Sequence, residues 1–522
     1  MIINLRTFAV DSFQSQYPIE SILSNEKKVL VLASDTKLLS LVKERISCLG
    51  GDFTVETGRQ LNLDIQGIFA ILAISRDVIE VITDPYAIIK LYHFNNDEMS
   101  LLSDSLTEFK GLTSEFNKNA LQYFFINGYT PSQHTFFRDI RKLEPCNHYV
   151  FDRSGDYKSN FYARFCQKQQ GGMDFLKTYR RTLENSLKLL FDRYGSVDLA
   201  LTGGMDSSIL FRFIKKLGLD KKLNVSVMRM EGVERVVKLD NDFDIEYATQ
   251  LSKDNGKTIR TISYDFSADN LADDFLKLSE ILGCEFNSGV PILNYLGKGS
   301  IDTVSVSGQN ADSVLSFGSM GTWRYRGFKL LGLNGVFSRY FHFFGVKLSS
   351  SSLGWIMHLL RSAYYALNHR KGRVSFNQEN YFTGLGISPV NRFFYEEDQS
   401  YADIAEPRKL KDWFIENYIE PLFKNKSRLS HHALALILYN KTYMQGSANR
   451  ASVLAAVAQG RQVYLPYTSL QLLELMSNLI PSHEYAIHGK YPNVSLKNEL
   501  EIPHYISERA DPNNCDSVAQ VN

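Results

Sequence analysis

Residues able to hold a triphosphate follow a short apolar run near the middle of the chain. The segment 197–210 reads VDLALTGGMDSSIL, so the run ends in two glycines, an aspartate and two serines. Gly203 and Gly204 have no Cβ, which lets backbone N–H groups come close to an anion. A helix that begins here would add unpaired N–H groups and the positive end of its dipole. The string therefore predicts a phosphate-binding loop in which the carboxylate of Asp206 is suited to Mg²⁺.

Two considerations decide how specific this loop is. No lysine follows the glycines, so it is not a loop of the GxxxxGK[ST] kind. A plain glycine turn between a strand and a helix is the simpler interpretation, but the complete string behind an apolar run is harder to obtain by chance. We therefore favour phosphate binding. The residues expected to contact the nucleotide in this loop are Leu201, Thr202, Gly203, Gly204, Asp206, Ser207 and Ser208.

The elements around the loop alternate in type, which predicts how they position it. From about residue 170 onward, helical spacing of apolar residues alternates with short β-forming runs. This alternation is typical of a parallel α/β sheet, and we expect a mainly helical chain after Val314. The expected helices are 175–194, 207–217 and 244–255, and the expected strands are 197–201, 223–230, 258–264 and 303–307.

Residues 1–160 are expected to form a β-rich domain. The runs 67–73 and 78–83 predict a hairpin around Ser75-Arg76-Asp77, and 148–151 is interpreted as the last strand. The fold class is thus α/β with a β-rich N-terminal domain. The other elements expected in this domain are a strand at 28–33 and a short helix at 119–125.

A second polar string follows the expected strand 303–307. Residues 304–318 read VSVSGQNADSVLSFG, about a hundred positions after the first loop. Taken alone, this string is as typical of a solvated loop as of a binding site. Asp206 and Asp312 would leave separate strand ends, and two such carboxylates at one Mg–pyrophosphate unit make chemical sense because the leaving group carries most of the charge.

Both strings resemble those of the asparagine synthetase family. The first is similar to the pyrophosphate loop SGGxDSS of ATP pyrophosphatases, with Thr202 in place of serine. The second is similar to the family pattern SGEGADEVFGGY. The resemblance implies that Ser307 and Gly308 contact ATP and that Asp312 joins Asp206 as a ligand of Mg²⁺.

The resemblance also implies a two-step reaction with ATP and Mg²⁺. A substrate carboxylate attacks the α-phosphorus to give an acyl-adenylate and pyrophosphate, and ammonia or an amine then displaces AMP. Met228 falls near the place where the family packs adenine. Gln309 replaces the glutamate of SGEGADE at a catalytic position where the similar β-lactam synthetases have tyrosine. An amide can orient a carboxylate or an amine, but it cannot act as a general base.

The resemblance extends over most of the chain. Three further segments match in the family's order: 63–91 looks like the end of its amidotransferase domain, 124–148 like the domain junction, and 448–475 like its DRASMA...E.R.PFLD stretch. This implies a degenerate amidotransferase-like β-sandwich domain at 1–160. An adenine-nucleotide α-hydrolase-like synthetase domain with a helical C-terminal half would occupy 170–510.

The N-terminal domain departs from the glutamine-hydrolysing members of the family. Those members place a cysteine directly after the initiator methionine, and its free α-amine is the base for its own thiol. Here the second residue is Ile2, and no cysteine precedes Cys48. We therefore expect no glutaminase activity, and ammonia or an amine as the nitrogen source. A shortened domain that lacks the N-terminal cysteine also resembles that of lasso-peptide cyclases.

The synthetase half departs from the family as well. The family's late lysine, in strings like R.K..F, has no counterpart where the tail reads Arg509–Asp511, and Gln459 or Ala458 lies nearest the glutamate expected before Arg461. Three alternatives therefore stay open. They are a lasso-peptide-type macrocyclase, a glutamine-dependent asparagine synthase, and a non-catalytic homologue that binds nucleotide or a biosynthetic partner protein.

The overall composition excludes several other classes. The chain has 522 residues, of which 44% are hydrophobic and 22% charged, as is ordinary for a soluble protein. Its net charge of +1 gives no bulk attraction to nucleic acid or membranes. Five scattered cysteines fit a reducing cytoplasm better than a disulfide framework. We expect no signal peptide and no membrane span, because the nearest apolar stretch, Gly321–Phe344, is interrupted by charges.

Overall fold

The computed structural model describes most of the N-terminal half of the chain and selected parts of the remainder. The aromatic-rich stretch 321–344 and the tail 509–511 both lie outside the described residues. The described parts are 1–165 without 13, 25–26, 50–52, 114 and 128; 173–267 without 233–234; 273; 296; 303–315; short pieces between 410 and 444; 448–477; and 491–503.

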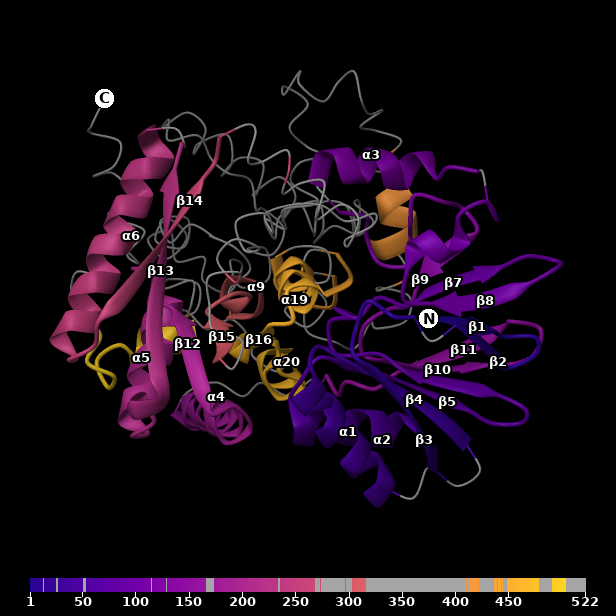
Figure 1. Ribbon diagram of the computed structural model, residues 1–522, viewed down its shortest axis with the longest axis horizontal. Coiled ribbons are helices and arrows are strands. Elements are labelled where there is room, and N and C mark those ends of the chain that lie inside the picture. Colours follow the sequence, from indigo (N-terminus) through magenta and orange to yellow (C-terminus); the bar gives the residue numbers. More distant parts are fainter. Residues whose placement is uncertain are drawn as a thin grey trace, which may run out of the picture.

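The N-terminal part contains two antiparallel sheets, which lie on the right in Figure 1. Their strands share one hydrophobic core, in which Ile3 and Leu102 of the first sheet join Leu30 and Ile71 of the second. The first sheet has the order β2 (Ala9–Ser12), β1 (Ile2–Asn4), β8 (Ser100–Ser103), β7 (Tyr92–Asn95), β9 (Ile140–Lys142). The second has the order β11 (Tyr157–Phe161), β10 (Asn147–Phe151), β6 (Ile79–Ile82), β5 (Phe69–Ile74), β4 (Lys27–Ala33), β3 (Ile19–Ser24).

The predicted hairpin in this domain is confirmed, since β5 pairs with β6 in antiparallel register. The prediction that 148–151 is the last strand is wrong. The turn after β10 leads into β11, which pairs with β10 along its whole length. Tyr157 and Phe161, at the two ends of β11, are half-buried, and the three polar residues between them are exposed. An edge strand of this kind has little apolar signal in the sequence.

Two helices of the N-terminal domain were not predicted. Helix α1 (Thr36–Cys48) begins at Asp35, whose carboxylate accepts the N–H of Leu38 at 2.8 Å. Helix α2 (Val55–Ile65) begins at Thr54, whose hydroxyl accepts the N–H of Thr57 at 3.1 Å. Both are side-chain caps of the usual kind. The remaining helices here are η1 (Leu106–Phe109) and α3 (Lys118–Asn127), which confirms the helix predicted at 119–125.

The second half contains a five-stranded sheet whose neighbouring strands all run parallel, as predicted. Its last strand, β16, has only three residues and was not predicted. The order is β14 (Ile259–Asp265), β13 (Leu223–Glu231), β12 (Ser196–Ala200), β15 (Thr303–Ser307), β16 (Gln462–Tyr464).

Helices flank this sheet and join it to the N-terminal domain. The predicted helices correspond to α4, α5 and α6, although α6 begins nine residues before its predicted start. Their bounds are α4 (Met173–Arg193), α5 (Met205–Lys216), η2 (Asp220–Lys222) and α6 (Arg235–Asp254). Later in the chain lie α9 (Ala311–Leu315), η6 (Ile415–Ile419), α19 (Ala448–Ala458), η7 (Pro466–Thr468), α20 (Leu470–Ser477) and α22 (Tyr491–Leu496).

Helix α20 lies between the two halves, packed against α2 on one side and α4 on the other (Figure 1). Its Glu474 accepts both the Nε and Nη2 groups of Arg59 on α2, at 2.8 and 2.7 Å. Glu474 also accepts the backbone N–H of Arg164 at 2.7 Å. A second link joins the hydroxyl of Tyr194 to Asp35, the cap of α1, at 2.7 Å. These bonds hold the two halves in one arrangement.

Within the described parts of the chain, every helix is too short or too polar to cross a bilayer.

Candidate phosphate-binding site

The loops after β12 and β15 meet where the order of the parallel sheet reverses. From β12 the chain adds β13 and β14 on one side, and it then returns to place β15 and β16 on the other. In open α/β sheets, the crevice beside the carboxyl ends of the strands at such a reversal is the usual ligand site. Ala200 and Ser307, which end the two strands, are paired in register. Both predicted loops therefore leave the same edge, side by side.

The first loop is shaped by its own hydroxyl groups. Ser207 Oγ accepts the N–H of Thr202 at 3.1 Å and lies 3.0 Å from the carbonyl oxygen of Thr202, to which it can donate. Ser208 donates to the carbonyl of Gly204 at 2.9 Å. Gly204 is the cap residue of α5 and provides no side-chain acceptor for the first N–H groups of that helix. The two serines thus hold the loop in shape at the start of α5.

The second loop touches the first through a glycine. A Cβ placed on Gly308 would lie 3.1 Å from the backbone nitrogen of Ser207 and 3.2 Å from Cβ of Asp206. A Cβ at these distances would have to displace the first loop by a few tenths of an ångström, so this position favours glycine. Two residues later, Asn310 has φ of 75°, a left-handed conformation that asparagine tolerates better than most residues. The family pattern SGEGADE has glycine at this place.

Asp206 is held by residues that the sequence did not identify. Asn493 of α22 donates its Nδ2 to Asp206 Oδ1 at 2.8 Å. Tyr467, in the turn after β16, donates its hydroxyl to the carbonyl oxygen of Asp206 at 3.2 Å. Tyr179 of α4 in turn donates to Asn493 Oδ1 at 2.6 Å. No local pattern could have indicated these partners, because they come from segments far from residue 206 in the chain.

The other predicted residues occupy the surroundings of the two loops. Leu201 is buried, and its N–H bonds to the carbonyl of Ser226 on β13 at 2.8 Å. Met228 lies half-buried on β13 and packs against the core. Gln309 is half-buried, and its backbone N–H lies 3.3 Å from the hydroxyl of Ser307. The backbone of Asp312 belongs to α9, and its side chain lies outside the described part of the structure.

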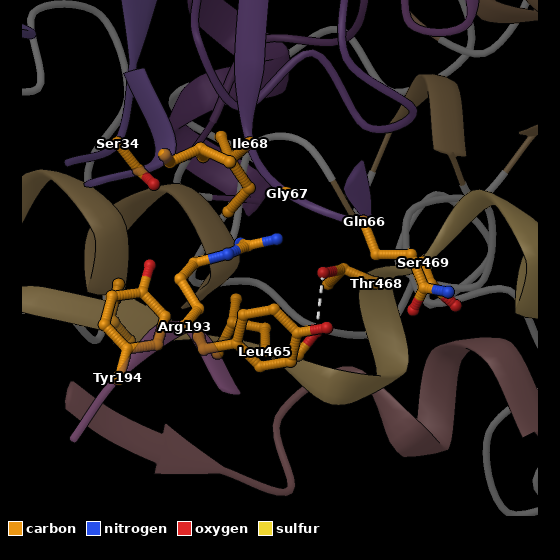
Figure 2. A pocket seen from close by; sticks show the side chains of 12 residues that line it. Ser34, Gln66, Gly67, Ile68, Arg193, Tyr194, Leu465, Thr468 and Ser469 are labelled. Atoms are coloured by element: carbon orange, nitrogen blue, oxygen red, sulfur yellow. Dashed lines mark hydrogen bonds between the residues drawn. The ribbon is translucent and has the colours of Figure 1, made fainter. Parts of the chain in front are cut away.

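A separate cavity lies at the junction of the two halves, away from these loops (Figure 2). Its volume is about 10 Å³, which is room for a single water molecule. Figure 2 shows Arg193 reaching between Ser34, Ile68 and Leu465. The guanidinium donates to the carbonyl oxygen of Ile65, so this cavity belongs to the contact between the halves rather than to the crevice.

The fold and the comparisons together define a class of protein. Residues 52–162 match the family of glutamine amidotransferase domains. Residues 52–162, which match that family, are followed by a parallel-sheet α/β part that has two polar loops at its switch point.

The chain is also similar in sequence to one individual protein. Over 158 residues the chain is 26% identical to a glutamine-hydrolysing asparagine synthetase 1 of Bacillus subtilis (strain 168). The alignment covers 29% of this chain and 25% of that protein, so the chain matches about a quarter of the relative's length.

Two solved structures show a more distant likeness. One is a glutamine-dependent NAD⁺ synthetase from Acinetobacter baumannii in complex with ADP, at 12% identity, a TM-score of 0.18 and coverage of 35% of this chain and 38% of that one. The other is a glutamine phosphoribosylpyrophosphate amidotransferase from B. subtilis complexed with ADP and GMP, at 11% identity, a TM-score of 0.18 and coverage of 57% and 65%.

Proposed function

We propose that the chain is an ATP-dependent, amide-forming ligase of the asparagine synthetase type. It activates a substrate carboxylate as an acyl-adenylate, releases pyrophosphate, and transfers the acyl group to ammonia or an amine with loss of AMP. The observation that carries the proposal is the contact between the two loops. Gly308 lies against Asp206 and Ser207 at the switch point of the parallel sheet, where a nucleotide is expected to bind.

The residues of the crevice fit a triphosphate. The uncapped start of α5 offers backbone N–H groups and the positive end of a helix dipole. Gly203 and Gly204 let phosphate oxygens approach the backbone, and Ser207 and Ser208 keep the loop in shape. Thr202, which is exposed, is placed to add a hydroxyl.

Asp206 and Asp312 are the proposed protein ligands of Mg²⁺. Among the described residues, no three His, Cys, Asp or Glu side chains cluster as a complete metal site. This suits Mg²⁺, which keeps several waters and phosphate oxygens and takes only one or two carboxylates from the protein. When bound, the ion would neutralise charge on the pyrophosphate leaving group.

We propose that the N-terminal domain no longer hydrolyses glutamine. Ile2 stands where the glutamine-hydrolysing members carry their cysteine, and the side chain of Met1 is fully buried in the core. Of the cysteines in the described residues, Cys48 lies at the end of α1, and Cys146 is buried with its thiol against the carbonyl of Pro85. Neither lies on β1. The nitrogen would then come from free ammonia or from an amine, and a lasso-type peptide amine is one candidate.

Exchange of labelled pyrophosphate into ATP tests the activation step directly. Purified protein, a panel of small and peptide carboxylates, and Mg²⁺ should give carboxylate-dependent exchange. Asp206→Ala should lower the rate by at least about 100-fold, because it removes a charge that stabilises the transition state. Asp242→Ala, at an exposed position on α6, is the matched control and should leave the rate unchanged.

Two results would contradict the proposal in different ways. Exchange that persists in Asp206→Ala would show that the chemistry lies elsewhere. Nucleotide binding without exchange for any carboxylate would favour a non-catalytic homologue, in keeping with the missing late lysine. Release of glutamate from glutamine by the purified protein would overturn the assignment of the N-terminal domain and restore a glutamine-dependent asparagine synthase.

A further inference from the structure

We infer that Asn493 is a positioning residue that orients the carboxylate of Asp206 for Mg²⁺. This role rests on the proposed function and extends it to α22, which belongs to neither loop. The Nδ2 group of Asn493 lies 2.8 Å from Asp206 Oδ1, and Asn493 is completely buried. A buried amide donor aimed at a carboxylate limits the rotation of that carboxylate.

The orientation of the amide is determined by its neighbours. Tyr179 donates its hydroxyl to Asn493 Oδ1 at 2.6 Å, so the oxygen of the amide must point toward α4. The amide nitrogen then faces Asp206, and it also lies 3.4 Å from the hydroxyl oxygen of Tyr467. Tyr467 donates onward to the backbone carbonyl of Asp206 at 3.2 Å. Two fully buried side chains, Asn493 and Tyr467, thus bond to Asp206, and the buried Tyr179 supports the first of them.

The segment that carries Asn493 is anchored across α4 and α5. Glu499 accepts from Lys216 on α5 at 2.9 Å and forms an ion pair with Arg180 on α4. Both partners hold the pKa of Glu499 below its usual value, the hydrogen bond from Lys216 first. Arg212 of α5 donates to the carbonyl of Glu501 at 2.7 Å. Leu496 and Leu500 are buried beneath these contacts, so the segment is fixed on the helix that begins at the phosphate loop.

The chemistry of the donor matters for a metal site. An amide is neutral, so it orients the carboxylate without cancelling the charge that attracts Mg²⁺. A lysine or arginine in the same place would form an ion pair and would repel the cation. Loss of a hydrogen bond between a neutral donor and a charged acceptor should change the affinity for Mg²⁺ about 10- to 100-fold.

Binding of α,β-methylene-ATP, measured by titration calorimetry at a series of Mg²⁺ concentrations, tests this role. Asn493→Leu keeps the branched shape of the side chain and removes all of its polar contacts. It should raise the Mg²⁺ concentration for half-maximal binding about 10-fold or more, and leave the affinity for the metal-free analogue within about 2-fold. Tyr179→Phe removes only the group that orients the amide, and it should raise the Mg²⁺ requirement about 3-fold. Asn498→Ala, exposed on the turn after α22, is the control and should match the wild type.

The outcomes separate this inference from the proposed function. Suppose that the wild type binds the analogue and that Asp206→Ala loses the Mg²⁺ dependence. If Asn493→Leu and Tyr179→Phe then keep the Mg²⁺ requirement of the wild type, the positioning role of Asn493 is wrong, but the nucleotide site is supported. If both variants weaken metal-free and metal-bound binding equally, Asn493 is only structural. If the wild type binds no nucleotide at all, the proposed function fails as well. Should Asn493→Leu not fold, Tyr179→Phe decides alone.

Discussion

At the scale of single residues, the site depends on one position that favours glycine and on another where the backbone adopts an uncommon conformation. Gly308 has the backbone nitrogen of Ser207 against it, and Asn310 takes the left-handed conformation that begins α9. Neither property is visible in hydrophobicity or charge. Both follow from two strand ends that bring their loops together at one edge of the sheet.

Gly308→Ala should separate the two loops. Its Cβ would meet the backbone of the first loop, which cannot move aside as the end of a flexible side chain can. We expect nucleotide affinity to fall about 10-fold, because a displacement of well under 1 Å already misplaces the phosphate donors. Gly195→Ala is the matched control, since nothing lies within 4 Å of the Cβ that it would add. Calorimetric titration of both variants would show equal affinities if the loop contact has no role.

At the scale of elements, α20 contributes to both halves of the molecule. Its Glu474 accepts two bonds from Arg59 on α2 and one from the backbone of Arg164. The hydrogen bonds that Arg59 donates to Glu474 are the first cause that raises the pKa of Arg59. The side chains of Arg59 and Glu474 are only 16% and 11% exposed, so water replaces their bonds poorly when one partner is removed.

Arg59→Met should therefore destabilise the protein by about 2 kcal/mol, less than for a fully buried pair because both groups retain some solvent. Arg45→Met provides the comparison. Arg45 pairs with Asp64 on the surface and is 45% exposed, and its loss should cost less than about 1 kcal/mol. Urea unfolding followed by fluorescence would measure both values. Equal effects of the two substitutions would mean that the contact between α2 and α20 is no stronger than a surface ion pair.

At the scale of the whole molecule, buried ionisable groups make stability depend on pH in two opposing ways. Burial first, and then the charge of Arg141, lower the pKa of His93 to about 4. Between pH 6.5 and 4 the unfolded chain therefore binds a proton that the folded chain does not, and stability falls as the pH falls. Burial raises the pKa of Asp84 to about 6, although hydrogen bonds from three backbone N–H groups act in the opposite direction. Its contribution to stability is present below its ordinary pKa and is lost as the pH rises through 6.

His93→Gln isolates the first of these effects. Glutamine does not titrate, so the free energy of unfolding of the wild type relative to this variant should decrease by about 2 kcal/mol from pH 7 to pH 5. Asp84 is present in both proteins and cancels in the difference. Urea titrations of the two proteins at pH 7, 6 and 5 would measure it. A difference that is constant across this range would show that His93 accepts a proton as easily in the folded state as in the unfolded state.

Much of this architecture is predictable from local patterns, and the remainder has identifiable physical reasons. The strands β12, β13, β14 and β15 were predicted within a few residues, because each is a short run rich in β-branched and apolar residues. Helix α1 was not predicted, although Asp35 caps it and its buried residues recur at helical spacing. Strand β16 is too short to carry a pattern.

The candidate site shows the same division. The first loop was predictable because glycines, hydroxyls and an aspartate follow an apolar run, whereas the second was indicated by its resemblance to the family pattern. The partners of Asp206 were not. Tyr467 lies in η7 and Asn493 in α22, and both reach Asp206 through tertiary contacts. Such contacts leave no periodicity in the sequence.

The pairing of β15 with β16 has a consequence for synthesis of the chain. Ser307 and Gln462 are about 155 positions apart, whereas the strands of the first two sheets all lie before residue 162. During synthesis on the ribosome, the N-terminal sheets can assemble before β16, the partner of β15, has been made. The unpaired edge of β15 is open to wrong partners throughout this interval, so newly made chains should need a chaperone most between the emergence of residue 315 and that of the turn containing Tyr467.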